Sequence, residues 1–144
     1  MRPLYETPED LAREREVADI LEEAWSCSLH KLPLSYHLDF CGCRGKEILS
    51  FIEVKVRKCL PTTYRSIMLS LNKFQHGLHY AVSTGCPFLF VVAFKDGSIY
   101  HKNLCDVPEE FPLEFGGRTK NTRDDFDVEP CILIAMEDMK ELRR

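Results

Sequence analysis

Residues 39–55 read DFCGCRGKEILSFIEVK, and this stretch decides the fold. It begins with an acid at the end of one expected strand and passes through a turn. It then enters a second strand that carries an acid and a lysine two positions apart. Side chains alternate between the faces of a strand, so Glu53 and Lys55 are expected on one face while Ile52 and Val54 enter a core on the other.

The residue types of this stretch suit a hard divalent cation. Asp39 and Glu53 offer carboxylate oxygens, which Mg²⁺ and Mn²⁺ prefer, and the backbone carbonyl of Val54 can supply another oxygen between them. Lys55 adds a point charge that can orient a metal-bound water and stabilise charge on a phosphate. Hydrolysis of a phosphodiester needs such a set. The alternative is that Glu53, Lys55 and Arg57 form the solvated face of an amphipathic strand.

This set resembles the PD-(D/E)XK nuclease superfamily, whose motif is an acid, a variable hairpin, and then Asp or Glu, any residue and Lys. The residues that match the motif here are Asp39, Glu53, Val54 and Lys55. Leu38 stands where the name of the motif has proline. The expected order of elements, helix, three strands, helix and strand, is also similar to the family, and residues 116–130 look like small phage-encoded members.

The resemblance implies an α/β fold in one domain over residues 1–144, with a mixed central β-sheet flanked by helices and a restriction-endonuclease-like α-β-β-β-α-β core. It implies a metal-dependent nuclease with DNA as the expected substrate. Mg²⁺ or Mn²⁺ would be held by Asp39, Glu53 and Val54, and Lys55 would position the attacking water. A homodimer stays open, because a nuclease with one site often pairs to cut both strands.

The first helix is expected from its N-cap Thr7 to about Trp25, with Pro8 at the first helical position. Glu14 falls on its apolar stripe, seven residues before Leu21. The resemblance implies that Glu14 is an auxiliary acid of the site, because junction-resolving members carry a glutamate at this spacing. The alternative is that Glu14 lies in water at the edge of the stripe. The fallback acids on this helix are Glu16 and Glu22.

Two strands are expected next, over 29–32 and 36–40, with residues 41–47 as the tip of a hairpin. A second helix is expected from Thr62 or Thr63 to about Ser83. Its predicted buried stripe consists of Ile67, Leu71, Phe74, Leu78 and Val82.

The resemblance implies that the second helix brings Lys73, or else Gln75, to the scissile phosphate. The alternative is that both are ordinary polar residues on an exposed helix face. The apolar run 88–94 predicts a central strand covered on both sides, followed by an Asp-Gly turn and a returning strand over 99–104. Residues 116–127 are expected to form a loop, 131–135 a last strand and 137–144 a short helix.

The formal net charge of −4 argues against a broad basic surface, because attraction to phosphates contributes much of the affinity for nucleic acid. Basic residues are nevertheless grouped along the chain, which leaves room for a focused patch. The alternative is that they are scattered solubilising charges. The residues expected to contact nucleic acid are Arg44, Lys46, Arg57, Gln75, Arg118, Lys120 and Arg123.

Seven cysteines, an odd number without a secretory signal, indicate reduced thiols. Cys41 and Cys43, with His37 nearby, offer a zinc alternative, but a second ligand pair at clear spacing is missing. The sequence contains no apolar run of membrane-spanning length. The protein is expected inside a cell, in a host if it is encoded by a phage.

Two other functional classes stay open at this level. The acidic net charge favours a nucleic-acid-binding or assembly module that keeps the fold without turnover, and divalent-metal binding would separate this module from an enzyme. A thiol-metal protein that uses Cys41 and Cys43 ranks third, and zinc content after purification would identify it.

Overall fold

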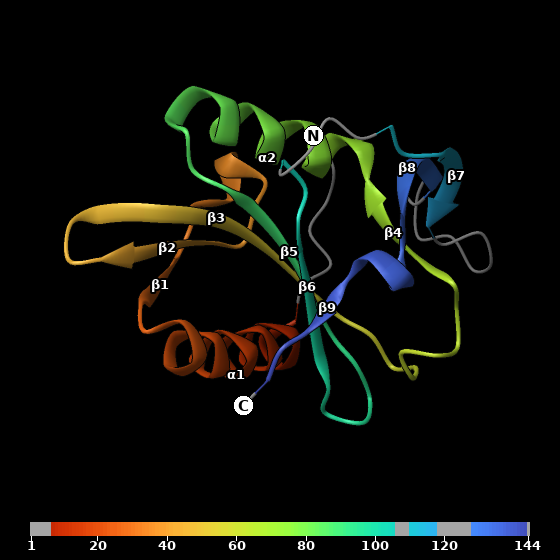
Figure 1. Cartoon of the computed structure of the whole chain (residues 1–144), viewed down its shortest axis with the longest axis horizontal. Coiled ribbons are helices and arrows are strands. Elements are labelled where there is room, and N and C mark those ends of the chain that lie inside the picture. The colour runs from red at the N-terminus through yellow and green to blue at the C-terminus, as the bar shows by residue number, and fades with distance from the viewer. Residues whose placement is uncertain (1–6, 106–109, 118–127, 144) are drawn as a thin grey trace.

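The computed structural model describes residues 7–105, 110–117 and 128–143, and Figure 1 shows the arrangement of its helices and strands. In chain order the elements are α1 (Pro8–Trp25), β1 (Ser28–Lys31), a 3₁₀ turn (Leu34–Tyr36), β2 (Phe40–Arg44), β3 (Glu47–Val56), β4 (Ser66–Ser70), α2 (Leu71–Thr84), β5 (Phe88–Ala93), β6 (Ile99–Asn103), β7 (Leu113–Gly117), β8 (Val128–Ala135), a second 3₁₀ turn (Met136–Asp138) and β9 (Lys140–Glu141). None of the described helices is long and apolar enough to cross a membrane.

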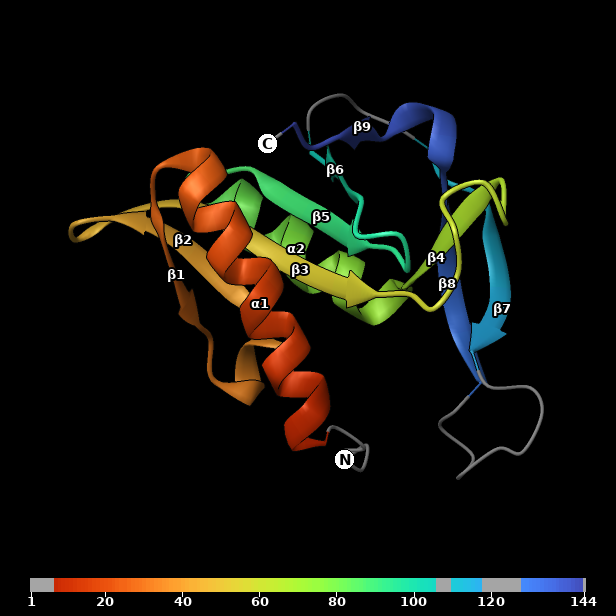
Figure 2. The same cartoon turned by 90° about the horizontal axis from the view of Figure 1, so that it is seen from below.

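The main sheet has six strands in the order β1-β2-β3-β5-β6-β9, and α1 and α2 cover its opposite faces (Figure 1). Its two central strands, β3 and β5, pair in parallel, whereas the other neighbours are antiparallel. A second sheet, in the order β4-β8-β7, lies at the end of the molecule opposite β1 (Figure 2). The main sheet is therefore mixed and flanked by helices, as predicted.

Alternation along β3 and β5 divides the core into two layers. Ile52, Val54 and Val91 pack toward Val17 and Leu21 of α1. On the other face, the buried cluster against α2 contains Phe51, Phe90, Val92 and Ala81. Because both faces are covered, the prediction of a central strand buried on two sides is confirmed.

Gly77 lets α2 approach the sheet closely. A Cβ atom added at this glycine would lie 2.3 Å from the ring of Phe88, which is fully buried. No larger residue fits there without a shift of the ring or of the helix. The first turn of α2 also lies beside β3, where Lys73 contacts Glu53.

The first helix begins and ends where the sequence predicts. The Thr7 side chain accepts from the Asp10 backbone N–H at 3.1 Å, and the Asp10 carboxylate accepts from the Thr7 N–H at 3.1 Å, which forms a capping box. The turn after β5 is also confirmed, with Gly97 at φ 86° and Asp96 accepting from the Ser98 N–H at 2.9 Å.

The prediction of a strand over residues 36–40 is wrong. Leu34–Tyr36 form a 3₁₀ turn that ends at His37, which has a φ of 61°, and β2 begins only at Phe40. Residues 41–44, expected in the hairpin tip, therefore belong to the strand. The tip is shorter than predicted, because Arg44 pairs directly with Glu47.

The second helix starts later than predicted, at Leu71, and residues 66–70 form the strand β4. Ile67 and Leu69 are buried on one face of this strand, where they pair with Ile134 and Ile132 of β8. The predicted helix stripe is also wrong at its far end, since Val82 is 78% exposed.

The C-terminal part differs from the prediction at two places. Leu113–Gly117 form β7, an edge strand that pairs with β8, so the strand extends into the segment expected to be a loop. The rest of that predicted loop, 118–127, lies outside the described residues. In place of a terminal helix, the chain makes a short 3₁₀ turn and then β9, which pairs with β6. The last predicted strand, over 131–135, is confirmed within β8.

Candidate active site

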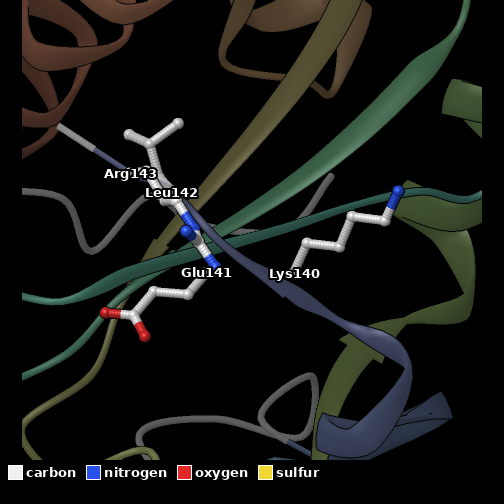
Figure 3. A pocket seen from close by; sticks show the side chains of 4 residues that line it. All are labelled: Lys140, Glu141, Leu142 and Arg143. Atoms are coloured by element: carbon white, nitrogen blue, oxygen red, sulfur yellow. The ribbon is translucent and has the colours of Figure 1, made fainter.

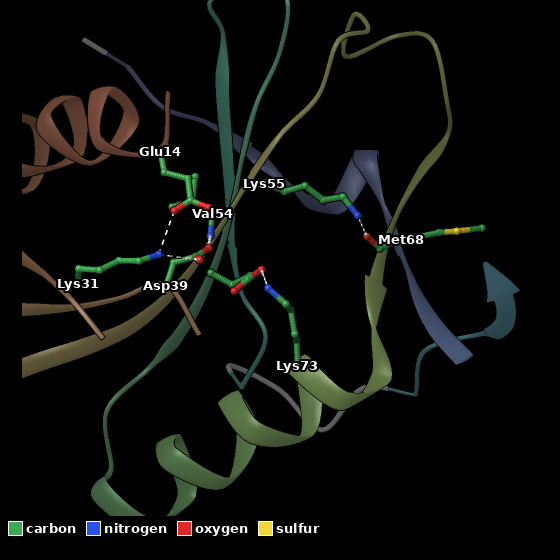
Figure 4. A network of polar contacts seen from close by, with 8 residues as sticks. Glu14, Lys31, Asp39, Val54, Lys55, Met68 and Lys73 are labelled. Atoms are coloured by element: carbon green, nitrogen blue, oxygen red, sulfur yellow. Dashed lines mark hydrogen bonds and ion pairs between the residues drawn. The ribbon is translucent and has the colours of Figure 1, made fainter. Parts of the chain in front are cut away.

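Two buried carboxylates, one just before β2 and one on β3, lie close together in the main sheet. Asp39 immediately precedes β2, and its carbonyl accepts from the Leu32 N–H at 2.9 Å, which closes the connection from β1. Its Oδ2 accepts from the Val54 N–H at 2.8 Å (Figure 4). Glu53 lies one residue before Val54 on β3. Asp39 and Glu53 are each only 5% exposed, and buried acids of this kind need compensating partners.

Each carboxylate is paired with a different lysine. Lys73 Nζ, in the first turn of α2, donates to Glu53 Oε2 at 2.6 Å. Lys31 Nζ, at the end of β1, donates to Asp39 Oδ1 at 3.3 Å and to Glu14 Oε2 at 3.0 Å (Figure 4). The predicted acids Asp39, Glu53 and Glu14 are thus brought together by two lysines, of which Lys73 was predicted and Lys31 was missed.

Lys55 shares the α2 side of β3 with Glu53, but its ammonium points toward the neighbouring strand. Its Nζ donates to the backbone carbonyl of Met68 at 2.8 Å (Figure 4). Burial lowers the pKa of this lysine, and the positive charge of Arg57 lowers it further, while the charge of Glu53 acts in the opposite direction. An ammonium has three donors, so Lys55 can keep Met68 and still hold a water.

Burial and neighbouring charges shift the pKa values of Glu53 and of its partner Lys73. Burial raises the pKa of Glu53 to about 8, and the nearby charge of Asp39 adds to this rise, while Lys73 opposes it. Burial alone would lower the pKa of Lys73, but the charges of Glu53 and Asp39 outweigh it and raise the pKa above its usual value. The two carboxyl groups therefore repel each other strongly enough that an additional cation between them would be stabilising.

The donor set fits a hard divalent cation. Glu53 Oε1 is buried and has no hydrogen-bond partner among the described residues. These residues contain no group of three or more His, Cys, Asp or Glu side chains that could hold a metal. Mg²⁺ is commonly held by one or two carboxylates together with waters and substrate phosphates, so two carboxylates suffice for it, whereas a closed structural zinc site needs more protein ligands.

A sequence model of the family described as "Phage putative PDDEXK endonuclease" matches residues 1–142. The chain belongs to this family. The predicted resemblance to the PD-(D/E)XK superfamily is therefore confirmed.

A solved structure supports the same fold. The chain is similar to Hjc of Archaeoglobus fulgidus, described as a Holliday junction resolvase, at 15% identity and a TM-score of 0.57, with 87% of each chain covered. At this identity the likeness shows the fold alone, which is the predicted restriction-endonuclease-like arrangement. The curated proteins compared with the sequence gave no match.

The two fallback acids of α1, Glu16 and Glu22, have other surroundings than Asp39 and Glu53. Glu22 accepts from Arg15 at 2.8 Å and from the Leu29 N–H at 2.7 Å, so it ties the helix to β1. Glu16 is exposed and lines a groove on another side of the helix. Of the three candidate acids on α1, the structure brings Glu14 to the site through Lys31.

The residues expected to contact nucleic acid are dispersed. Arg44 donates to the Ser26 carbonyl at 3.2 Å, and Lys46 occupies the hairpin tip, at the opposite end of β2 from Asp39. Arg57 lies 5.9 Å from the ring centroid of Tyr64 and lines a groove of about 670 Å³ between α1 and the ends of β3 and β5. Gln75 is exposed on α2. Three further predicted contacts lie outside the described residues: Arg118, Lys120 and Arg123.

The cysteine pair that offered a zinc alternative is buried inside β2. The Sγ atoms of Cys41 and Cys43 are 3.7 Å apart, and burial raises the pKa of the Cys41 thiol to about 11. His37, the nearby imidazole, instead stacks on His76 with 4.2 Å between ring centroids. A protonated thiol is a poor zinc ligand, so this arrangement favours a packing role for the pair.

A hollow of about 830 Å³ at the C-terminal segment is unrelated to the carboxylates. It is lined by four consecutive residues around β9, Lys140, Glu141, Leu142 and Arg143 (Figure 3). Because a single segment lines it, the hollow gathers no set of groups from separate elements. The chemistry of this PDDEXK member is better sought around Asp39 and Glu53.

Proposed function

We propose that this chain is a divalent-metal-dependent nuclease that hydrolyses phosphodiester bonds of DNA, with Mg²⁺ or Mn²⁺ held by Asp39, Glu53 and the Val54 carbonyl. One observation carries the proposal. Two buried carboxylates come together beside three lysines, and Glu53 Oε1 lacks a hydrogen-bond partner among the described residues. Family membership supports the reaction class.

The protein groups have distinct tasks in this proposal. A bound cation would lower the pKa of its water and neutralise charge on the phosphate. Lys55, fixed at one donor by the Met68 carbonyl, orients the attacking water with its other donors. Lys73, whose pKa the two acids raise, stays protonated and contacts the scissile phosphate. Glu14 acts as an outer acid, held near Asp39 by Lys31.

The substrate proposed for the first test is branched DNA. The structurally similar Hjc is described as a Holliday junction resolvase, but the likeness covers the fold and not the substrate. Labelled four-way junction, duplex and single-stranded DNA should therefore be compared directly. A homodimer is proposed for the active form, because cutting both strands of a duplex or junction with one site per chain requires two chains.

The experiment compares the parent with Glu53→Gln and Lys55→Ala, in Mg²⁺ or Mn²⁺. Loss of a group that transfers or orients a proton typically lowers the rate by about 10²- to 10⁴-fold, which we expect for both variants. Lys95→Ala is the matched control, since this lysine is exposed in the turn after β5. Cutting that persists in Glu53→Gln would contradict the assignment of the site.

The second candidate function is a nucleic-acid-binding module without turnover. It is favoured by the internal pairing of Glu53 with Lys73 and of Asp39 with Lys31, which compensates both acids without a metal. DNA binding without cleavage, together with no Mn²⁺ binding by calorimetry, would establish this alternative.

A further inference from the structure

Lys31 holds a position that a divalent cation would also need. Asp39 has two carboxylate oxygens, and Oδ2 is engaged by the Val54 N–H at 2.8 Å. Oδ1 accepts from Lys31 Nζ at 3.3 Å. The Asp39 side chain is only 7% exposed, so its approach from solvent is narrow. Because the backbone of β3 holds Oδ2, Oδ1 is the oxygen that a cation would take, and the Lys31 ammonium contacts it.

The contacts of Lys31 hold its ammonium beside Asp39, although the side chain is not buried. Its Nζ also donates to Glu14 Oε2 at 3.0 Å and lies 5.3 Å from the ring centroid of Phe40. The Lys31 side chain is 39% exposed, whereas that of Glu14 is 14% exposed. The long Lys31 side chain is partly exposed and can change rotamer, so it can leave Asp39 Oδ1, whereas the Val54 N–H holds the buried Asp39 carboxylate in place.

The two lysines that contact the carboxylates, Lys73 and Lys31, differ in whether they compete with a cation for a carboxylate oxygen. Lys73 contacts Glu53 Oε2 at 2.6 Å and leaves the buried Glu53 Oε1 without a described hydrogen-bond partner, so a cation on Oε1 would not have to displace Lys73. On Asp39, by contrast, both carboxylate oxygens already accept a hydrogen bond, one from Lys31 and one from the Val54 N–H. Competition with a cation therefore falls on Lys31.

We propose that Lys31 is a built-in competitor for the divalent cation: it neutralises Asp39 and Glu14 in the metal-free protein and must release Asp39 Oδ1 when the cation binds. Lys31 is thus a positioning residue that sets the metal affinity of the site. This inference rests on the proposed function, because it assumes the metal site at Asp39 and Glu53.

The test is calorimetric titration of Mn²⁺ into the full chain, with three substitutions. Lys31→Gln removes the charge but keeps a donor for Asp39, which protects folding. Lys31→Arg keeps the charge and adds a planar fork that binds a carboxylate more firmly. Lys95→Gln makes the same charge change as Lys31→Gln at an exposed lysine in the turn after β5.

We expect the Mn²⁺ dissociation constant to be lowest for Lys31→Gln, intermediate for the parent and highest for Lys31→Arg. Loss of one charge-assisted hydrogen bond predicts about tenfold tighter binding for Lys31→Gln and a few-fold weaker binding for Lys31→Arg. Lys95→Gln should stay within about twofold of the parent. In chelator, Lys31→Gln should have a lower thermal midpoint than the parent, and saturating Mn²⁺ should raise its midpoint by more.

Two results would overturn the inference, and they have different meanings. If Lys31→Gln binds Mn²⁺ no more tightly than the parent, or Lys31→Arg binds it more tightly, Lys31 does not compete and only this inference fails. If neither the parent nor Lys31→Gln binds Mn²⁺, the proposed metal site fails and the inference fails with it. Binding by Lys31→Gln alone would support the competition strongly.

Discussion

Glu53→Gln should stabilise the metal-free protein in alkaline buffer, although it removes a proposed catalytic group. Burial, with the charge of Asp39, raises the pKa of Glu53 from an ordinary 4.5 to about 8. At about 1.4 kcal/mol for each pKa unit, this rise means that the ionised, buried Glu53 lowers the unfolding free energy by about 5 kcal/mol above pH 8. Gln carries no charge to bury, so the variant avoids this cost.

The sign of the pH dependence follows from proton binding. Between pH 4.5 and about 8 the folded state holds a proton on Glu53 that the unfolded state has released. The contribution to stability is therefore complete below pH 4.5 and is lost as the pH rises through 8. Glu53→Gln should resemble the parent near pH 5 and exceed it near pH 9.

The net gain at pH 9 should be about 2–4 kcal/mol, smaller than the full cost, because the substitution also removes the charged partner of Lys73. Lys73 has a side chain that is 40% exposed, so it can reach water after the change. Urea unfolding in chelator at the two pH values measures the difference. Glu47→Gln is the control, since Glu47 is exposed on the same strand. A Glu53→Gln variant less stable than the parent at pH 9 would refute the reasoning.

Three further predictions test the packing, the helix cap and the metal. Gly77→Ala should destabilise the fold by about 1–3 kcal/mol in urea unfolding, because its methyl group would lie 2.3 Å from the Phe88 ring; an unchanged midpoint would contradict this close approach. Thr7→Ala should cost about 1 kcal/mol through loss of the capping box, seen as a thermal midpoint lower by about 3 °C, whereas Thr7→Ser should restore it. Mn²⁺ should raise the thermal midpoint of the parent but not that of Asp39→Asn, and equal increases would place the metal elsewhere.

The parts of the fold that the sequence predicts correctly depend on local signals. Thr7, Pro8 and Asp10 specify the start of α1 through contacts within one turn. The Glu53-x-Lys55 pattern needs only strand alternation to place both side chains on one face. The Asp96-Gly97 turn is equally local, since it depends on a positive φ at glycine and a short side-chain hydrogen bond.

The largest error occurs where distant pairing decides the structure. The segment 62–70 has apolar residues that suit either a helix or a strand, and pairing of Ile67 with Ile134 selects the strand β4. The strand expected over 36–40 is wrong for a local reason instead. Residues 34–36 form a 3₁₀ turn, and His37 ends it in a left-handed conformation.

Lys31 shows the same limit within the site. Nothing in its immediate sequence distinguishes it from other exposed lysines, and it stands eight residues before Asp39. It reaches Asp39 because β1 pairs antiparallel with β2, and it reaches Glu14 because α1 packs on β1. A side chain whose role depends on three elements at once cannot be found from the motif alone.

The pairing of acids and lysines also links metal affinity to stability. Lys31 and Lys73 neutralise acids that would otherwise be buried and uncompensated, so they stabilise the metal-free protein. A cation that binds the same acids replaces part of that neutralisation. A substitution that removes Lys31 should therefore weaken the metal-free fold and strengthen metal binding together. A Lys31 substitution that changed only one of these two properties would show that folding and metal binding use different groups.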